Sequence, residues 1–426
     1  MNFNSNKEKL IFYNIPTILF SFIPFFLITG PLLSDISVSF ISLLFLIYCV
    51  KKKNFLYFRN KYFYFFLIFW LYLIINSLIN NFNLDSLKIS FFYFRYGVFV
   101  IAMVALLKVD EKFIKYFFYC IFVCFLALVF DGFYQYFVGQ NILGWKSSVR
   151  ISSFFGEEKI LGSYLSRLWP IFFGLSTLVL KQRNKLFYLF LLTFIFSEAL
   201  IFISGDRSAF FYINLSAVFV ILFSQKLIKL RLFTLICSIT ILILISVINP
   251  TAKERVFDTT LNQMNLSEEK KQEKDQEGIY IFSKEHTHHY ITAYKMYLDN
   301  KFLGVGIKNF RNFCDDDSLN EKVHEKWQKR KCSTHPHNFY FEMLSEIGSV
   351  GFLIIISFFI FSFYTFFDSY KKNKDTFLLL NCFIILIYFI PFLPKGSFFS
   401  NWNAMIFWFV FSFIFSIYNK SLNEKS

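Results

Sequence analysis

Apolar runs of roughly twenty residues recur along the whole chain, and they restrict the possible folds more than any other feature. A run that crosses a bilayer must be a helix, because lipid offers the backbone no hydrogen-bond partners. Hydropathy predicts about twelve such segments. Their approximate bounds are 11–29, 32–50, 62–80, 89–107, 114–138, 162–180, 186–203, 209–224, 232–249, 348–367, 376–394 and 400–418. Only 17% of the residues are charged, against about 25% in soluble domains. The sequence therefore predicts an all-α polytopic membrane protein.

The distribution of lysine and arginine predicts how the chain is oriented. Every second short loop is basic. These loops contain Lys51, Lys52, Lys53, Arg59 and Lys61; Lys108, Lys112 and Lys115; Lys181, Arg183 and Lys185; Lys226, Lys229 and Arg231; and Lys371, Lys372 and Lys374. Because basic loops stay in the cytoplasm, we expect both termini to be cytoplasmic. The formal net charge of +15 then reflects topology, and it does not indicate a nucleic-acid partner.

The longest segment between predicted spans, 250–347, is expected to form one large periplasmic loop domain between the ninth and tenth spans. It separates an N-terminal transmembrane bundle at 1–249 from the C-terminal transmembrane helices at 348–426. Inside the loop, 266–278 is polar enough to be a flexible insert. The stretch 286–300 has the spacing of a helix that lies on the membrane surface.

Two of the seven cysteines, Cys314 and Cys332, lie in this loop. An oxidising periplasm favours a disulfide between them, and two free thiols are the alternative. The other cysteines lie in or beside predicted spans, where cysteine is most simply a small apolar residue.

All six histidines lie in the same part of the chain, at His286, His288, His289, His324, His335 and His337. Pro336 favours an extended backbone, so His335 and His337 could point the same way and meet one metal ion. The nearby third ligand of structural zinc sites is missing, and we expect no metal. Alternatively, Pro336 starts a helix that Asn338 caps. The third possibility is catalysis, because a neutral histidine can take a proton from a hydroxyl group.

His337 and Asn338 are followed by nine residues and then by "GSVG", Gly348 to Gly351. This spacing, the neighbouring "FLGVGIKNFR" and the many spans resemble the O-antigen ligase and O-antigen polymerase superfamily. The resemblance implies a glycosyltransferase of the bacterial inner membrane that needs no cofactor, with His337 as its catalytic residue. Its donor would be a glycan on a polyprenyl diphosphate, taken at the periplasmic face. Its acceptor would be the lipid A-core in a ligase or a growing glycan in a polymerase.

A departing diphosphate needs fixed positive charge, which arginine supplies through its forked guanidinium. "FISGDRSAFF" places Arg207 between two apolar spans, and the resembling family has an arginine at this position. We therefore expect Arg207 to bind the diphosphate; a salt bridge to Asp206 or a guanidinium that snorkels to the interface is the alternative.

The family's second arginine, at the start of the surface helix, is missing here, because that stretch reads "HTHHY". Arg311, or a histidine of the group His286, His288 and His289, could replace it; we carry Arg311, His286 and His289 forward as candidate ligands of the diphosphate. His335, Asn338 and Arg150 are possible supporting residues.

A transporter of lipid or glycan is the alternative from another functional class. Transporters place polar or broken helices near the midplane of the bilayer. Here most polar residues outside the basic loops are expected at the outer face instead, as the histidines and Arg207 are. The sequence therefore favours a transferase whose partners are a lipid-linked donor, a saccharide acceptor and the surrounding lipids.

Overall fold

The computed structural model describes residues 1–80, 83–110, 112–147, 150–180, 184–223, 228–248, 253–264, 266, 280, 282–314, 332–373, 376–390 and 393–423. Within these ranges every regular element is a helix. The predicted flexible insert at 266–278 lies outside the described residues except for Leu266, and so does His324.

The twelve predicted spans each coincide with a helix or a pair of consecutive helices. In chain order the elements are α1 (Asn6–Lys9), the π-helix η1 (Leu10–Asn14), α2 (Ile15–Thr29), α3 (Pro31–Lys51), η2 (Leu56–Phe58), α4 (Lys61–Ile79), α5 (Leu84–Phe92), α6 (Phe94–Leu107), α7 (Lys112–Val138), η3 (Ser153–Phe155), α8 (Leu161–Val179), α9 (Lys185–Ile203), α10 (Arg207–Phe223), α11 (Ile228–Ile248), η4 (Glu254–Asp258), α13 (Thr259–Gln263), α14 (Lys284–Asp299), α15 (Phe310–Phe313), α16 (Phe339–Asn373), α17 (Thr376–Tyr388) and α18 (Asn401–Asn423).

Eight helical segments of the described chain are long and apolar enough to cross a membrane. Two further apolar helices, at Arg207–Phe223 and Asn401–Ser416, are shorter. The all-helical, multi-pass membrane fold is therefore confirmed. The count of twelve spans, the division at 249 and 347, and the side on which each loop lies stay predictions.

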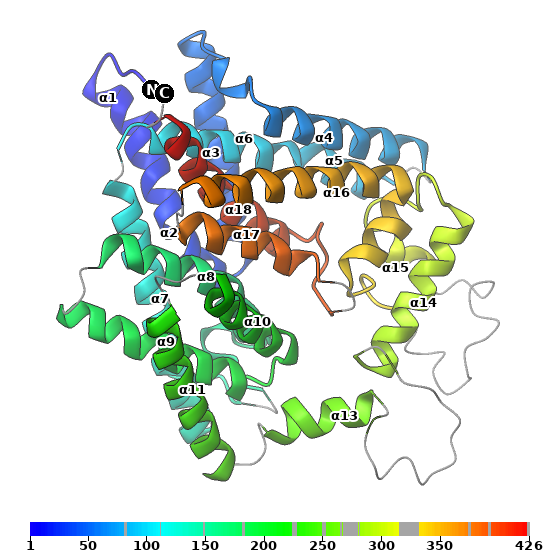
Figure 1. Ribbon diagram of the computed structural model, residues 1–426. Coiled ribbons are helices and arrows are strands. Elements are labelled where there is room, and N and C mark those ends of the chain that lie inside the picture. Colours follow the sequence, from blue (N-terminus) through cyan, green and yellow to red (C-terminus); the bar gives the residue numbers. More distant parts are fainter. Residues whose placement is uncertain are drawn as a thin grey trace.

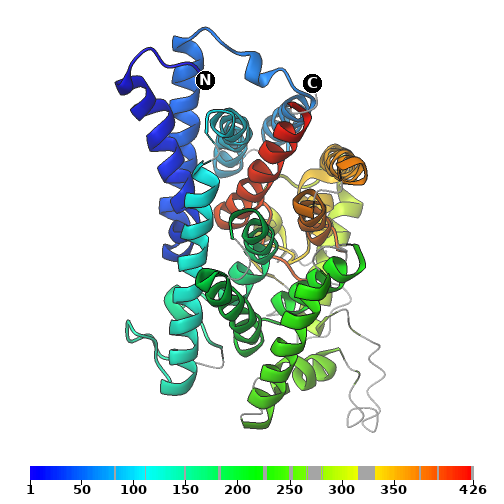
Figure 2. The same ribbon diagram turned by 60° about the vertical axis from the view of Figure 1, so that its left-hand side comes forward.

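The helices pack into one bundle from which α14 and α15 project (Figure 1). The inner helices α6 and α18 pack against each other, α4 packs against α16, and α2 packs against α3 and α7. Both termini lie on the same side of the molecule, away from α14 (Figures 1 and 2). A continuous apolar core holds the bundle together, with Trp169 and Trp408 among its largest buried side chains. The bundle is thus a scaffold that carries α14 and the start of α16 at one end.

A kink in α16 explains Gly348, the first of the two glycines in the motif. Gly348 has φ 64° and ψ −174° inside this helix, a conformation that side chains with a Cβ rarely adopt. The backbone of 301–306 runs directly against it, so that a Cβ on Gly348 would lie 2.3 Å from the Phe302 carbonyl oxygen. A Cβ on Gly304 would lie 2.5 Å from the Glu346 carbonyl carbon. Glycine is therefore required on both sides of this contact, which joins α16 to the turn that follows α14.

The bundle also holds this turn from the side. On α4, the Asn76 amide donates to the Leu303 carbonyl at 2.6 Å, and the Asn80 amide donates to the carbonyls of Leu303 and Gly304, both at 3.0 Å. Tyr72 donates to the Ile347 carbonyl at 2.6 Å. Tyr72 thus satisfies a carbonyl group of α16 beside the kink, and Asn76 and Asn80 satisfy carbonyl groups of the turn that follows α14. The glycine turn is thus fixed between α4 and α16.

Three arginines lie in surroundings that differ from those the sequence indicates. Arg231, which we placed in a basic loop, is buried in α11, where it forms an ion pair with Glu198 of α9 and stacks on Trp169. Arg95 and Arg167 lie near the expected outer ends of their spans, where the sequence favours side chains that snorkel to the interface. Arg95 instead pairs with Asp35 at 2.7 Å. The third, Arg167, donates to Asn403 of α18.

Candidate active site

The histidine motif lies where the chain enters α16. Asn338 caps this helix: its side-chain oxygen accepts hydrogen bonds from the N–H groups of Tyr340 at 2.9 Å and Phe341 at 3.4 Å. His337 has a φ of 57°, in the left-handed region, which turns the chain just before the helix begins. Its carbonyl accepts a hydrogen bond of 2.6 Å from the N–H of Lys395, in the segment before α18. His337 is therefore held by the capped start of α16 on one side and by the segment before α18 on the other.

Three other imidazole rings surround that of His337. The centroid of its ring lies 4.0 Å from that of His335, 5.4 Å from that of His286 and 5.5 Å from that of His289. His286 and His289 belong to α14, which packs along the first part of α16 (Figure 1). The structure thus brings together all four of the predicted site histidines, which come from two separate stretches of the chain.

Burial keeps the imidazoles of His286, His335 and His337 neutral, because it lowers the pKa of each. It lowers the pKa of His337 to about 2, and the neighbouring histidines lower it further in the same direction. Burial likewise lowers the pKa of His286 and of His335 to about 4. The charge of Arg207 contributes to the low pKa of His286. A neutral imidazole has a ring nitrogen that can accept a proton, so the cluster has the protonation state that a general base requires.

The low pKa values predict a protein that loses stability in mild acid. In the unfolded chain a histidine has a pKa of about 6.5, so between that value and the lower folded pKa the unfolded state binds more protons. The stability contributed by the neutral cluster is fully present above pH ~7 and is lost progressively as the pH falls below ~6.5. We expect the free energy of unfolding to fall by about 1–2 kcal/mol per histidine by pH ~5. Melting temperatures in detergent across this range would measure the loss.

A triple variant provides the control. His286→Gln, His335→Gln and His337→Gln together remove the three groups, so the melting temperature of that variant should depend much less on pH between ~6.5 and ~5. A native protein whose melting temperature stays constant over this range would contradict the neutral cluster. If the melting temperature of the triple variant depended on pH as strongly as that of the native chain, groups other than these three histidines would be responsible for the loss of stability.

Arg207 lies at the start of α10 and does not pair with its neighbour Asp206. The Asp206 carboxylate instead accepts hydrogen bonds from the Ser163 hydroxyl at 2.8 Å and from the Ala209 N–H at 3.1 Å, so it caps α10. Arg207 donates to the Thr260 hydroxyl at 3.3 Å, and its guanidinium carbon lies 5.1 Å from the centre of the Phe282 ring. The salt-bridge alternative for Arg207 therefore finds no support in this geometry.

Two more arginines approach Arg207. Arg255 of η4 and Arg150 of the loop before α8 are both close enough for their charges to act on Arg207. Arg255 donates from Nε to the Gly205 carbonyl at 3.2 Å, and burial together with the charge of Arg150 lowers its pKa. Three guanidinium groups thus share one partly buried region. The charges of Asp206 and Glu285 partly offset the repulsion between these arginines, and a bound anion would offset it further.

Arg255 was not predicted from the sequence. It lies in "KERVFD", a mixed polar segment after the ninth predicted span, and nothing local distinguishes it from an ordinary interfacial arginine. Its hydrogen bond to Gly205, which directly precedes Asp206 and Arg207, shows that Arg255 lies beside the start of α10. By contrast, Arg311 is exposed and donates to the Thr334 carbonyl at 3.3 Å. Arg255 therefore lies with Arg207, whereas Arg311 lies near His335, on whose pKa its charge acts.

Phe282 and His286 connect the arginines with the histidines. The Phe282 ring packs against the Arg207 guanidinium, and its centroid lies 5.6 Å from the centroid of the His286 ring, which in turn contacts His337. Residues 207 and 337 are thus linked by three successive side-chain contacts. Of the two residues between them, Phe282 precedes α14 and His286 lies in its first turn.

The segment that leads to the motif is held by a covalent bond and a buried carboxylate. A disulfide joins Cys314 and Cys332, whose Cα atoms lie 5.1 Å apart. The Glu346 carboxylate accepts hydrogen bonds from the N–H groups of Lys308 at 2.8 Å and Phe310 at 3.4 Å. Glu346 therefore holds the turn before α15 against α16. Among the described residues, no group of three or more histidine, cysteine or acidic side chains is arranged to hold a metal ion.

Comparison with known proteins agrees with this geometry. Residues 189–356 match the family described as O-antigen ligase. No curated protein matches the chain. The matched segment runs from α9 to the first half of α16, and it contains Arg207, Arg255 and the four clustered histidines, while Arg150 precedes it. The resemblance seen around His337 is confirmed, and the chain carries the O-antigen ligase domain of the O-antigen ligase and polymerase superfamily.

Proposed function

We propose that this protein transfers a glycan from a polyprenyl diphosphate to a hydroxyl group of a saccharide acceptor at the periplasmic face of the membrane. The acceptor oxygen forms the new bond to the anomeric carbon of the donor sugar. The bond from that carbon to the diphosphate oxygen breaks, and the diphosphate leaves with the electron pair. The hydroxyl proton passes to the imidazole of His337. All atoms and charges are thus accounted for without a cofactor.

The observation that carries this proposal is the joining of a neutral histidine cluster and an arginine cluster through Phe282 and His286. General base catalysis needs the neutral imidazole, and a leaving diphosphate needs fixed cations. Each cluster alone has a simpler structural explanation. Their proximity, in a domain of the O-antigen ligase family, supports a transferase with a phosphorylated donor.

In this proposal Arg207 and Arg255 bind the diphosphate, with Arg150 beside them. Guanidinium groups suit this role because they form bidentate hydrogen bonds to phosphate oxygens and stay charged. His286 and His289 lie next to the base, and His286 also contacts Phe282, which packs on Arg207. The negative charge of the bound donor raises the pKa of His337 from its low resting value, toward the range in which a base accepts a proton efficiently.

Ligation to the lipid A-core and polymerisation of glycan on the carrier use the same residues in this proposal. The test is to delete the gene in its host and to separate the surface lipopolysaccharide on a gel. Loss of the long-chain ladder with intact core identifies the ligase. A core that carries a single repeat identifies the polymerase. An unchanged ladder would contradict both.

A further inference from the structure

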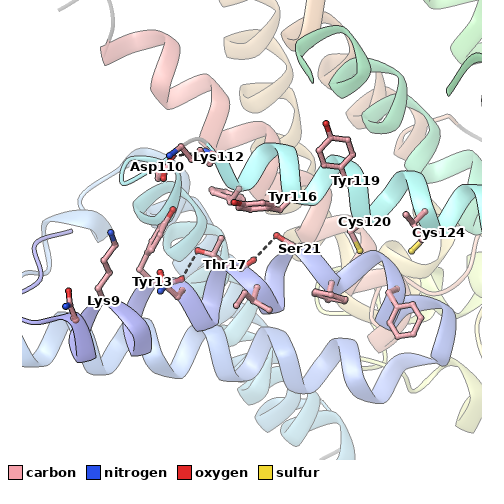
Figure 3. Close-up of a pocket in the computed structure, with 17 residues that line it drawn as sticks. Lys9, Tyr13, Thr17, Ser21, Asp110, Lys112, Tyr116, Tyr119, Cys120 and Cys124 are labelled. Atoms are coloured by element: carbon pink, nitrogen blue, oxygen red, sulfur yellow. Dashed lines mark hydrogen bonds between the residues drawn. The ribbon is translucent and has the colours of Figure 1, made fainter. Parts of the chain in front are cut away.

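A long groove lies between the N-terminal helices and α7, away from the histidines and arginines of the proposed active site. It runs along α1, η1 and α2 on one side and along α7 on the other, and its volume is about 1180 Å³. Figure 3 shows its side chains in two rows that face each other. Ligand pockets in proteins typically have roughly 300–1,000 Å³, so this space is large enough for a sizeable molecule.

The groove changes from charged to apolar along its length. Lys9 and Lys112, together with Asn6 and the acidic Asp110, line the end at which α1 and α7 begin. Phe25 and Val123 line the other end. Such an order, with cations at one end and apolar side chains at the other, matches an amphiphile with an anionic head group.

The two lysines keep their charge available for such a head group. The nearest acidic residue on α1, Glu8, is engaged by Lys51 and Lys52 of the α3 end, at 2.7 Å and 2.9 Å. Asp110 accepts a hydrogen bond of 2.8 Å from the Lys112 N–H and so caps α7. In the part of the chain that the structure describes, neither Lys9 nor Lys112 forms an ion pair.

Two hydroxyl groups in the middle of the groove, those of Thr17 and Ser21, donate their hydrogen bonds to the protein. The Thr17 hydroxyl donates to the Tyr13 carbonyl at 2.7 Å, and the Ser21 hydroxyl donates to the Thr17 carbonyl at 2.8 Å (Figure 3). Both donors are thus satisfied within the helix. The π-helix η1, Leu10–Asn14, lies at the charged end of this wall, and π-helical turns occur frequently at functional sites.

We infer that this groove binds one anionic phospholipid, with its phosphate between Lys9 and Lys112 and an acyl chain along Ile18, Phe22 and Val123. The basic loops beside the charged end assign it to the cytoplasmic leaflet, where anionic lipids attract clustered lysines. The site shares no residue with the proposed active site, so it does not depend on the proposed transfer reaction.

The test is a titration of fluorescent phosphatidylglycerol into the full chain in detergent. Each lysine near an anionic head group contributes about 1 kcal/mol, so Lys9→Gln with Lys112→Gln should weaken binding about 30-fold. The control is Lys7→Gln with Lys115→Gln, which makes the same charge change on the same two helices at positions outside the groove. We expect that control to stay within about threefold of the native chain.

A second variant addresses the apolar part of the groove. Val123→Trp fills the space for an acyl chain, so it should also weaken binding while both lysines remain. Equal affinity for phosphatidylcholine and phosphatidylglycerol, or equal losses in the groove and control variants, would overturn the proposal. Stronger binding of a polyprenyl phosphate, which phosphatidylglycerol does not displace, would overturn the choice of occupant.

Discussion

Replacing His337 with asparagine should abolish glycan transfer and leave the protein as stable as the native chain. The imidazole is the only group in the proposed mechanism that takes the acceptor proton, and such a base contributes roughly 10²–10⁴-fold to a rate. The φ of 57° at this position is one that asparagine adopts more readily than most residues, so the backbone is not strained by the change. Transfer by purified protein from a lipid-linked donor, together with the melting temperature, would measure both effects.

His337→Ala gives the comparison that separates chemistry from folding. Alanine also lacks the base but tolerates a positive φ less well, so it should be equally inactive and less stable by about 1 kcal/mol. If both variants were equally inactive but differed in stability, the loss of activity would be due to the missing imidazole and not to a loss of stability. If His337→Asn transferred glycan at a rate near that of the native chain, His337 would not be the base.

The positions of the helices could be predicted because bilayer crossing constrains the sequence strongly. Long apolar runs exclude strands and loops, and every predicted span coincides with observed helix. The place of Arg231 could not be predicted in this way. Lys226 and Lys229 beside it indicate a basic loop, but α11 begins at Ile228 and carries Arg231 into the bundle, where only Glu198 on another helix explains it.

The histidine motif could be predicted from local spacing, because its parts are close in the sequence. Its glycines have a structural cause that one sequence does not reveal: Gly348 allows the backbone of Phe302 to approach α16. The same motif gave no indication that the rings of His286 and His289 would meet His337. That contact depends on how α14 packs against α16, which is a property of the folded chain.

The arginine cluster was the hardest feature to predict. The sequence indicated Arg207 through its position between two spans, and it offered Arg150 only as a supporting residue. For the second arginine it offered Arg311, which could reach in from the other side of the glycine turn, or a histidine of the group His286, His288 and His289. The fold returns η4 to the α9–α10 junction, and Arg255 thereby reaches Gly205. The approach of Arg255 to Arg207 depends on how separate helices pack, and no local pattern records it.

Arg207→Ala and Arg255→Ala are each expected to slow transfer by roughly 10²–10³-fold, the usual effect of removing one donor that stabilises developing negative charge. Lysine at either position should restore part of the rate, since it keeps the charge but loses the bidentate geometry. The double alanine variant should be only slightly slower than either single variant, because groups that act as a unit are not additive. Rates of transfer from a lipid-linked donor would measure these effects.

The comparison with Arg311 decides which arginine completes the site. Arg311→Ala removes the same charge from an exposed side chain that donates a hydrogen bond to the Thr334 carbonyl. We therefore expect it to slow transfer less than tenfold. Inorganic diphosphate gives a readout independent of turnover: it should raise the melting temperature of the native chain and of Arg311→Ala, but much less that of Arg255→Ala. Arg311→Ala could instead reduce the rate and the stabilisation by diphosphate more than Arg255→Ala does. That result would identify Arg311, and not Arg255, as the second arginine that binds the diphosphate.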